Sequence, residues 1–222
     1  MYIAECKDMG IRVLAPDINE SDLGFRPGAG NIRFGMLAVR NVGEGAIRSM
    51  LQFRKQHGRF RNLFQFCEEV DSRAVNKRVL ESLIKCGALD SFGWKRSQLM
   101  ALADAAIEHG QKIQRDRESG QKGLFIDLMA GQAAITDAQA PDMPEWLPEQ
   151  ILAYEKETLG YYVSGHPLER YSAELSRFTT KTLAELISDG KSCECRVAGI
   201  VTESRSRRTK KGDPMAVIIL ED

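Results

Sequence analysis

The sequence has no long hydrophobic run and only a few cysteines, which argues against a membrane-spanning protein and against a disulfide-stabilised one. Its 222 residues are 43% hydrophobic and 28% charged, which suits a packed core, and no segment has the length and apolarity of a membrane span. The first ten residues carry charges at Glu5, Lys7 and Asp8, so they lack the apolar core of a signal peptide. The five cysteines are odd in number and scattered, which is typical of reduced thiols. These features predict a cytoplasmic protein with no membrane partner.

The sequence also has no net charge, yet its 31 basic and 31 acidic residues are segregated. Residues 31–62 hold seven basic side chains against one acid, residues 126–157 hold seven acids against one lysine, and residues 191–211 hold seven basic side chains against two acids. Two basic regions separated by an acidic segment suit a polyanion such as nucleic acid, although solvated surface faces alone produce the same pattern.

Hydrophobic spacing predicts a mainly helical chain that ends in a β-hairpin. The helical period occurs at 2–10, 46–58, 60–70, 76–87, 95–113 and 148–171, the last broken by a turn at 164–167, and in short pieces at 173–178 and 181–190. In the segment at 76–87 we expect Gly87 to end the helix and the apolar side chains to form its buried stripe; these side chains are Val79, Leu80, Leu83 and Ile84. Residues 11–18 resemble a short strand, and glycine and proline predict a loop over 19–31. From residue 193 the pattern alternates like two strands joined by a basic loop. Because an isolated hairpin is marginal in water, we expect a piece of a longer protein.

The segment NVGEGA, residues 41–46, places a glycine turn before the helix expected from about Ala46. Gly43 and Gly45 can adopt positive φ and let a partner approach the backbone, while the N–H groups of the helix point toward the turn. This arrangement predicts a cradle for DNA phosphates, and its alternative is an ordinary helix connector. The candidate contact residues are Arg40, Asn41, Val42, Gly43, Glu44, Gly45, Ala46 and Arg48.

A second glycine turn, LIKCGALDSFG at 83–93, also lies between two expected helices. Two helix-hairpin-helix units side by side can hold both backbones of a duplex without reading its sequence. The second turn lacks a G-x-G core, so it can instead brace the first. Its candidate contact residues are Lys85, Gly87, Lys95 and Arg96.

Other candidate sites are weaker. Cys193 and Cys195 form a C-x-C pair without a further Cys or His nearby, and His166 has no evident nucleophile or carboxylate partner, so we expect neither a metal site nor a catalytic residue. The loop between the last two strands suits a nucleic-acid backbone, and a solvated loop is an equal alternative. Its basic residues are Arg205, Arg207, Arg208, Lys210 and Lys211.

Four stretches resemble, in the same order, the alpha subunit of bacterial replicative DNA polymerase III. They are IRFGMLAVRNVGEGAI, NLFQFCEEVDSRAVNKRVLESLIKCGALDSFG, YEKETLGYYVSGHPLERY and VAGIVTESRSRRTKKGDPMAVIILED. The resemblance implies the end of a fingers domain at 1–30, a tandem helix-hairpin-helix module at 31–118, a flexible tether at 119–148, a helical connector at 149–189 and the first two strands of an OB-fold at 190–222. It implies a DNA-directed DNA polymerase (a nucleotidyltransferase) whose palm aspartates and Mg²⁺ ions have no counterpart here, so we expect no polymerisation by this chain alone.

The expected tether contains SGQKGLFIDL, residues 119–128, in which two apolar side chains stand beside each other. By the resemblance, Gln121, Leu124 and Phe125 match a pattern that docks on the sliding clamp. Burying the Leu and the Phe contributes about 3–6 kcal/mol, and ordering the segment costs about 2–5 kcal/mol. The motif alone is therefore expected to bind at about micromolar affinity or weaker. The alternative is a local hydrophobic latch on the preceding helix.

The expected function is non-specific binding of duplex DNA and docking on the clamp, without a catalytic centre, cofactor or metal in this segment. The expected partners are double-stranded DNA, the sliding clamp and other polymerase III holoenzyme subunits. One alternative is a stand-alone DNA-binding and clamp-tethering protein without polymerase activity, which the reading frame immediately upstream distinguishes. Another is a structural remnant that binds nothing.

Overall fold

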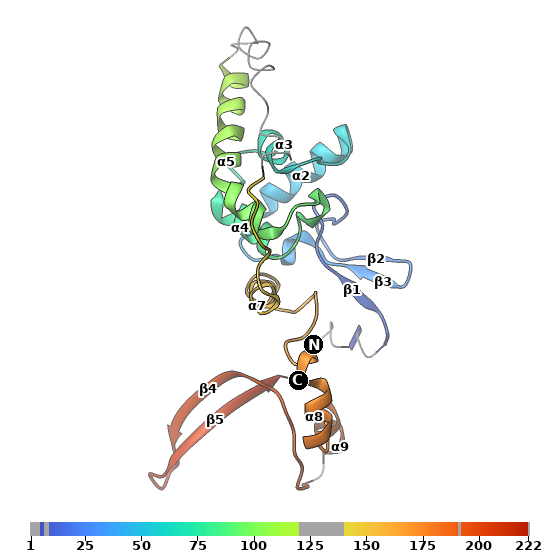
Figure 1. Cartoon of the computed structure of the whole chain (residues 1–222), viewed down its shortest axis with the longest axis vertical. Helices are drawn as coiled ribbons and strands as arrows, with labels where there is room; N and C mark the ends of the chain where they lie inside the picture. The colour runs from blue at the N-terminus through green and yellow to red at the C-terminus, as the bar shows by residue number, and fades with distance from the viewer. Residues whose placement is uncertain (1–4, 7–8, 120–139, 191, 222) are drawn as a thin grey trace. The chain divides into compact units, whose positions relative to one another are not determined.

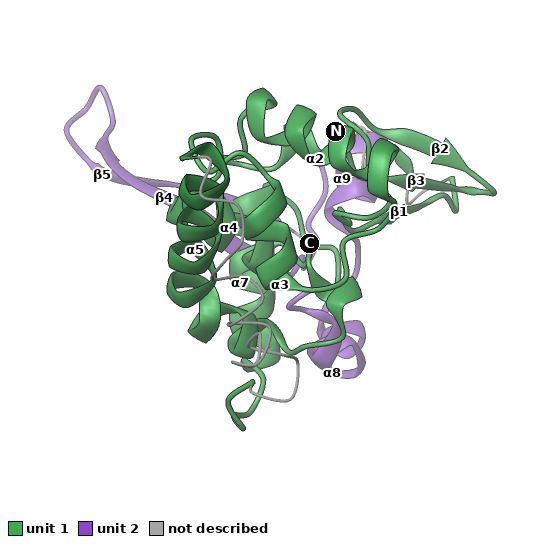
Figure 2. Ribbon diagram, turned by 90° about the horizontal axis from the view of Figure 1, so that it is seen from above, with its two compact units in different colours: residues 1–164 green, residues 165–222 purple. Residues whose placement is uncertain are grey.

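The computed structural model describes residues 5–6, 9–119, 140–190 and 192–221 (Figure 1). The chain separates into two compact units, Met1–Ser164 and Gly165–Asp222 (Figure 2). Most of the helix expected at 2–10 lies outside the described residues, as do Gln121, Leu124 and Phe125. Within the described ranges, no helix combines the length and apolarity needed to cross a membrane.

Unit 1 begins with a small three-stranded sheet. It consists of β1 (Arg12–Leu14), β2 (Arg26–Gly28) and β3 (Asn31–Arg33) in the order β1-β3-β2, with β1 parallel and β2 antiparallel to β3. Strand β1 lies within the range of the strand expected at 11–18 and confirms it. The prediction of a loop over 19–31 was wrong, because this range contains β2. Gly30, with φ 78°, lies in the turn between β2 and β3, so the glycines there close a hairpin.

The helices follow from local signals, and they confirm the mainly helical class. They are α2 (Glu44–His57), α3 (Leu63–Glu69), α4 (Lys77–Lys85), α5 (Arg96–Glu118) and α7 (Pro148–Leu159), with short 3₁₀ helices η1 (Met36–Ala38) and η2 (Asp90–Phe92). Asn62 and Asn76 cap α3 and α4, because each side chain accepts a hydrogen bond from a backbone N–H of the first turn. Gly87, with φ 79°, ends α4 as expected.

The core of unit 1 is built from the apolar faces of α2, α3, α4 and α5. Helix α5 approaches α3 closely because Gly110 has no side chain: a Cβ there would lie 2.2 Å from the carbonyl oxygen of Cys67. The apolar stripe expected on α4 is confirmed as buried, and its members are Val79, Leu80, Leu83 and Ile84. This core fixes the loops between the helices, where the two glycine turns lie.

Unit 2 contains short helices followed by an antiparallel hairpin. The helices are η4 (Glu169–Tyr171), α8 (Ser172–Phe178) and α9 (Leu183–Asp189), and the hairpin consists of β4 (Ile200–Arg208) and β5 (Pro214–Glu221). The capping box of Thr182 and Glu185 starts α9. The hairpin confirms the two strands expected after residue 193, with a register that runs from Ile200 opposite Glu221 to Arg208 opposite Pro214.

Candidate nucleic-acid interface

The first glycine turn is an exposed loop that is anchored from beneath. It joins η1 to α2, and the side chains of Val39 and Val42 are buried in the core. Between and after these anchors, Arg40, Asn41 and Gly43 are exposed. Two apolar anchors therefore hold the turn in place while its backbone faces solvent.

The backbone of this turn differs from the expectation based on its glycines. Gly43 is the N-cap of α2 with φ −79°, and Gly45 lies inside the first helical turn, so the prediction of positive φ at these two residues was wrong. An N-cap residue takes an extended conformation, which places Gly43 outside the left-handed region. The residue with positive φ is Asn41 (φ 68°), and its side-chain amide donates a hydrogen bond to Oγ of Ser82 at 3.0 Å. Helix α2 also begins at Glu44 and not at Ala46.

The N-terminus of α2 is open to an anion. In the described part of the chain no side chain caps this 14-residue helix, so its first backbone N–H groups have no side-chain acceptor. A Cβ at Gly43 would meet no atom within 4 Å, and a Cβ at Gly45 would meet only the Cβ of Ala74 at 3.9 Å. The missing side chains thus let a ligand approach the N–H groups, where the positive end of the helix dipole favours a phosphate.

Two arginines flank this open helix end. Arg40 is exposed, and its backbone N–H donates to the carbonyl oxygen of Thr158 in α7 at 2.8 Å, which fixes the backbone of the turn. Arg48 is exposed one turn into α2, and its Nε donates to Oε1 of Glu44 at 2.9 Å. An exposed helical pair of this kind contributes only about 0.3–0.5 kcal/mol, so a phosphate can replace the carboxylate as the partner of Arg48.

The second glycine turn differs because a carboxylate of the chain itself occupies the N-terminus of the helix that follows. Glu145 accepts hydrogen bonds from the backbone N–H groups of Arg96 at 2.7 Å and of Ser97 at 3.0 Å. Burial acts to raise the pKa of Glu145, but the hydrogen bonds from Trp146, Ser97 and Arg96 outweigh it, so the net shift is downward. A charged carboxylate therefore fills the position that a phosphate would take at α5.

Residues 141–147, at the end of the expected tether, pack along the start of α5. Nζ of Lys95 donates to the carbonyl oxygen of Met143 at 2.9 Å, and Nε2 of Gln98 donates to that of Pro141 at 2.9 Å. This segment holds Glu145 at the helix end and directs Lys95 toward the protein.

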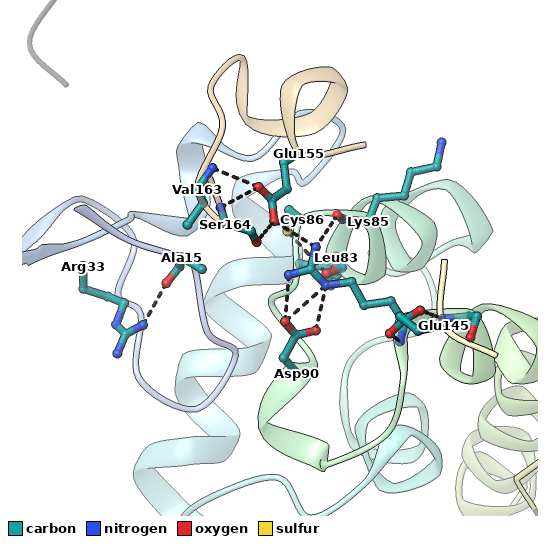
Figure 3. A network of polar contacts seen from close by, with 12 residues as sticks. Ala15, Arg33, Leu83, Lys85, Cys86, Asp90, Glu145, Glu155, Val163 and Ser164 are labelled. Carbon is teal, nitrogen blue, oxygen red and sulfur yellow. Dashed lines mark hydrogen bonds and ion pairs between the residues drawn. The ribbon is translucent and has the colours of Figure 1, made fainter. Parts of the chain in front are cut away.

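Figure 3 shows a polar network between the second turn and α7, in which Asp90 and Glu155 are labelled; Arg96 joins these two carboxylates. The side chain of Arg96 is only 9% exposed; Nε and Nη2 donate to Asp90 at 3.0 and 2.8 Å, and Nη1 donates to Oε1 of Glu155 at 3.0 Å. Glu155 is 0% exposed and also accepts the backbone N–H groups of Val163 and Ser164, each at 2.9 Å. Burial acts to lower the pKa of Arg96, but Asp90 and Glu155 outweigh it and raise the pKa, so the guanidinium stays charged.

The remaining candidates of the second turn also have partners inside the protein. Nζ of Lys85 lies 3.1 Å from Oε1 of Glu157 and 4.8 Å from the ring centre of Tyr154. Gly87 leaves room for the guanidinium, because a Cβ there would lie 2.2 Å from Nη2 of Arg96. These contacts favour the alternative in which the second turn braces the first.

In unit 2, the five basic residues expected to face a nucleic acid lie on the last part of β4 and in the loop after it, and all five are exposed. Arg205 pairs with Glu203 on its own strand. Arg205 and Arg207 stand opposite Val217 and Met215, so these two side chains share one face of the hairpin. Cys193 and Cys195 are free thiols, and no group of three or more metal-ligating side chains occurs among the described residues.

The fold around the two turns matches a known motif: residues 10–99 match the helix-hairpin-helix motif family. This match and the geometry above define a module of the helix-hairpin-helix class. The curated relatives include DNA polymerase III subunit alpha of Saccharopolyspora erythraea, which is 37% identical over 231 residues that cover 100% of this chain and 19% of the relative. The same subunit of Vibrio cholerae is 37% identical over 99% of this chain, and that of Mycobacterium tuberculosis is 38% identical over 100%, each again with 19% of the relative covered.

The chain therefore belongs to the family of DNA polymerase III alpha subunits, as a segment of such a subunit, and the resemblance seen in its motifs is confirmed. It spans about a fifth of the length of these relatives.

Three residues that shape the interface were not predicted from the sequence. They are Glu145, which fills the N-terminus of α5, Glu155, which holds Arg96, and Thr158, which holds the backbone of Arg40. Each acts on a partner far away in the sequence, so no local pattern marks it. The sequence held one signal for these contacts, which is the acidic run at 126–157, because it contains Glu145 and Glu155.

Proposed function

We propose that this segment binds double-stranded DNA without sequence preference, through the turn formed by residues 40–48, within a DNA polymerase III alpha subunit. The observation that carries the proposal is the uncapped N-terminus of α2, where two glycines expose the backbone between Arg40 and Arg48. Backbone N–H groups and arginines bind phosphate oxygens, which every base pair presents alike. The proposed contact thus positions the duplex and reads no base.

The proposal assigns unequal parts to the two turns. At α5 the carboxylate of Glu145 already accepts the first N–H groups, and the guanidinium of Arg96 is enclosed by Asp90 and Glu155. A phosphate there would have to displace an internal anion. We therefore assign the direct contact to the first turn and leave Arg96 out of the proposed interface.

The DNA proposal is tested by fluorescence anisotropy with two labelled duplexes of unrelated sequence, over a series of salt concentrations. The wild type should bind both duplexes equally. The variant Arg40→Gln/Arg48→Gln should bind more weakly, and its slope of log affinity against log salt should be shallower by about 0.9 for each lost phosphate contact. The matched control is Lys112→Gln/Arg115→Gln, which removes two exposed charges from α5. If the control weakens binding as much as the test variant, the attraction is diffuse and the turn is not the site.

We also propose that Gln121, Leu124 and Phe125 dock on the sliding clamp. The support is the match of these residues to the docking pattern, and their place directly after α5, which ends at Glu118. Leu and Phe can enter a hydrophobic pocket while the glutamine hydrogen-bonds at its rim. Because DNA would hold the segment beside the clamp at an effective concentration on the order of mM, micromolar docking is sufficient.

The docking proposal is tested by clamp binding in the presence and absence of a primed duplex. Leu124→Ala/Phe125→Ala should abolish binding, and DNA should strengthen binding of the wild type. The control is Leu128→Ala/Met129→Ala, an apolar pair in the same segment but outside the pattern. If the two double variants lose clamp affinity equally, the contact depends on the apolar character of the whole segment, and the proposal that these three residues form the docking motif is wrong.

Polymerisation and the Mg²⁺ ions that serve it are proposed to belong to parts of the alpha subunit that this segment does not span. Two buried or capping carboxylates of this segment already have partners inside the protein: Glu155 pairs with Arg96, and Glu145 accepts a hydrogen bond at the N-terminus of α5. In a primer-extension assay with Mg²⁺ the 222-residue chain alone should incorporate no nucleotide. Incorporation by the purified chain would contradict this division of roles.

A further inference from the structure

A basic groove lies at the opposite end of α2 from the glycine turn. Two adjoining hollows share Asn19 and Arg54 in their walls; one extends to the β2–β3 hairpin and the other to the turn at Gly58. The two hollows together are called the Arg54 groove. The hairpin that forms one wall projects away from the helices of unit 1 (Figure 1), and its residues 26–30 are all exposed.

The Arg54 groove carries an excess of positive charge. Two acids line it, Glu20 and Asp22. Five cations line it as well, which are Arg26, Arg33, Arg54, Lys55 and Arg59. Five positive and two negative charges leave a local balance of +3, in a chain whose net charge is zero. Such an excess in a hollow favours a polyanionic ligand.

The acids of the groove satisfy its guanidinium groups only in part. Glu20 pairs closely with Arg33, and Arg54 donates to the carbonyl oxygen of Ser21. The other N–O distances between the acids and the guanidinium groups are longer, at 3.5 Å from Arg26 to Asp22, 3.9 Å from Arg54 to Asp22 and 3.8 Å from Arg59 to Glu20. A charge-assisted hydrogen bond is shorter, at about 2.7–2.9 Å. Arg26 and Arg59 are also 63% exposed, so their remaining N–H donors face solvent. Planar guanidinium groups with open donors match the oxygens of a phosphate.

One face of α2 connects the Arg54 groove to the glycine turn. Arg48 and Lys55 are seven residues apart and both exposed, so they lie two turns apart on the same side of the helix, at a distance of about 10 Å. The whole helix is about 20 Å long, which equals the rise of about six base pairs of duplex DNA. A single backbone can therefore pass from the open helix end, past these two cations, to the groove.

We propose that the Arg54 groove is a second phosphate-binding site, which takes the backbone of the same duplex that the glycine turn holds. The inference rests on the proposed DNA binding by that turn. An acidic peptide would offer similar carboxylate oxygens, but the alignment of Arg48 and Lys55 with the turn favours a continuous nucleic-acid backbone. The Arg54 groove thus extends the interface along α2 to the β2–β3 hairpin.

The test compares five forms of the 222-residue chain in the salt-dependent anisotropy assay on one duplex: the wild type, the turn variant Arg40→Gln/Arg48→Gln, two groove variants and the α5 control. Arg26→Gln/Arg59→Gln should lower the salt slope by about 1.8, and Lys55→Gln should lower it by about 0.9, whereas Lys112→Gln/Arg115→Gln should leave it unchanged. Lys55 makes no ion pair within the described residues, so its variant tests the groove without removing a contact of the fold. A labelled polyglutamate peptide is titrated in parallel with each variant.

The outcomes separate the groove from the turn. If both groove variants behave like the α5 control while Arg40→Gln/Arg48→Gln still binds weakly, the groove inference is wrong and the turn remains the site. If the groove variants lose the peptide but keep the DNA affinity, the Arg54 groove is an acidic-peptide site and the inference is likewise overturned. If the wild type binds no duplex, the proposed function and the inference both fail.

Discussion

Removal of the Glu155 carboxylate should destabilise unit 1 far more than removal of an exposed carboxylate on the same helix. Glu155 is 0% exposed and accepts from Nη1 of Arg96 at 3.0 Å and from the N–H groups of Val163 and Ser164. In Glu155→Ala the guanidinium of Arg96 loses one of its two anionic partners while it remains buried. Breaking a buried ion pair from one side costs about 3–5 kcal/mol, and we expect about 3 kcal/mol because Asp90 remains.

The measurement is urea unfolding followed by tryptophan fluorescence, which reports on Trp94 and Trp146 in unit 1. The matched control is Glu157→Ala, two residues further along α7. Glu157 pairs with Lys85, but its side chain is 51% exposed, so its removal should lower the free energy of unfolding by only about 0–1 kcal/mol. Glu155→Gln should fall between the two, because the amide oxygen still accepts one hydrogen bond while the charge is lost.

A loss in Glu155→Ala no larger than the loss in Glu157→Ala would refute the reasoning. It would mean that water or a side-chain shift satisfies Arg96 equally well, and that the network does not fasten α7 to the second turn. A large loss in both variants would indicate that α7 docks through the charges of its exposed face, and the burial argument would again be wrong.

Three further predictions follow from single contacts. Gly110→Ala should lower the free energy of unfolding by about 1–3 kcal/mol in the urea assay, because its Cβ would lie 2.2 Å from the carbonyl oxygen of Cys67; an unchanged midpoint would contradict this close approach. The lowered pKa of Glu145 means that its stabilisation is present above the ordinary value of 4.5 and is lost as pH falls through the folded pKa. The melting temperatures of wild type and Glu145→Gln should therefore differ at neutral pH and converge in acid, and a constant difference would argue against the cap. Burial raises the pKa of Cys67 and of Cys86 to about 12, so mass spectrometry after iodoacetamide treatment of the native protein should find the exposed Cys193 modified and these two unmodified.

The helices could be predicted from the sequence because their causes are local. The apolar spacing of α4 and its stop at Gly87 lie within a dozen residues, and both have the predicted role. The cap at Asn76 is equally local, although it was not predicted. The hairpin of unit 2 could be predicted for the same reason, because the alternation of apolar and polar side chains in a strand is a property of adjacent residues. Strand β2 was missed because it contains a proline and a glycine, which usually indicate a loop.

The assignment of basic residues to the interface could not be predicted in the same way. The sequence shows that Arg96 is basic and follows a glycine turn, but it does not show that Glu155, 59 residues later, neutralises it. The same holds for Lys85, whose partner Glu157 is 72 residues away. Pairing depends on how distant helices pack, so a count of charges near a motif overestimates the number that a ligand can reach.

Helix α7 connects the two glycine turns, and this explains why they have different roles. One of its residues, Glu155, holds Arg96 of the second turn, and Thr158, one helical turn later, accepts the backbone N–H of Arg40 in the first. The charges of the second turn are therefore used within the protein, where they fix the helix that positions the first turn. It follows that Glu155→Ala should weaken binding of duplex DNA even though Glu155 is fully buried and touches no ligand. If the folded variant binds DNA with the affinity and salt slope of the wild type, α7 is only a stabilising helix and does not position Arg40.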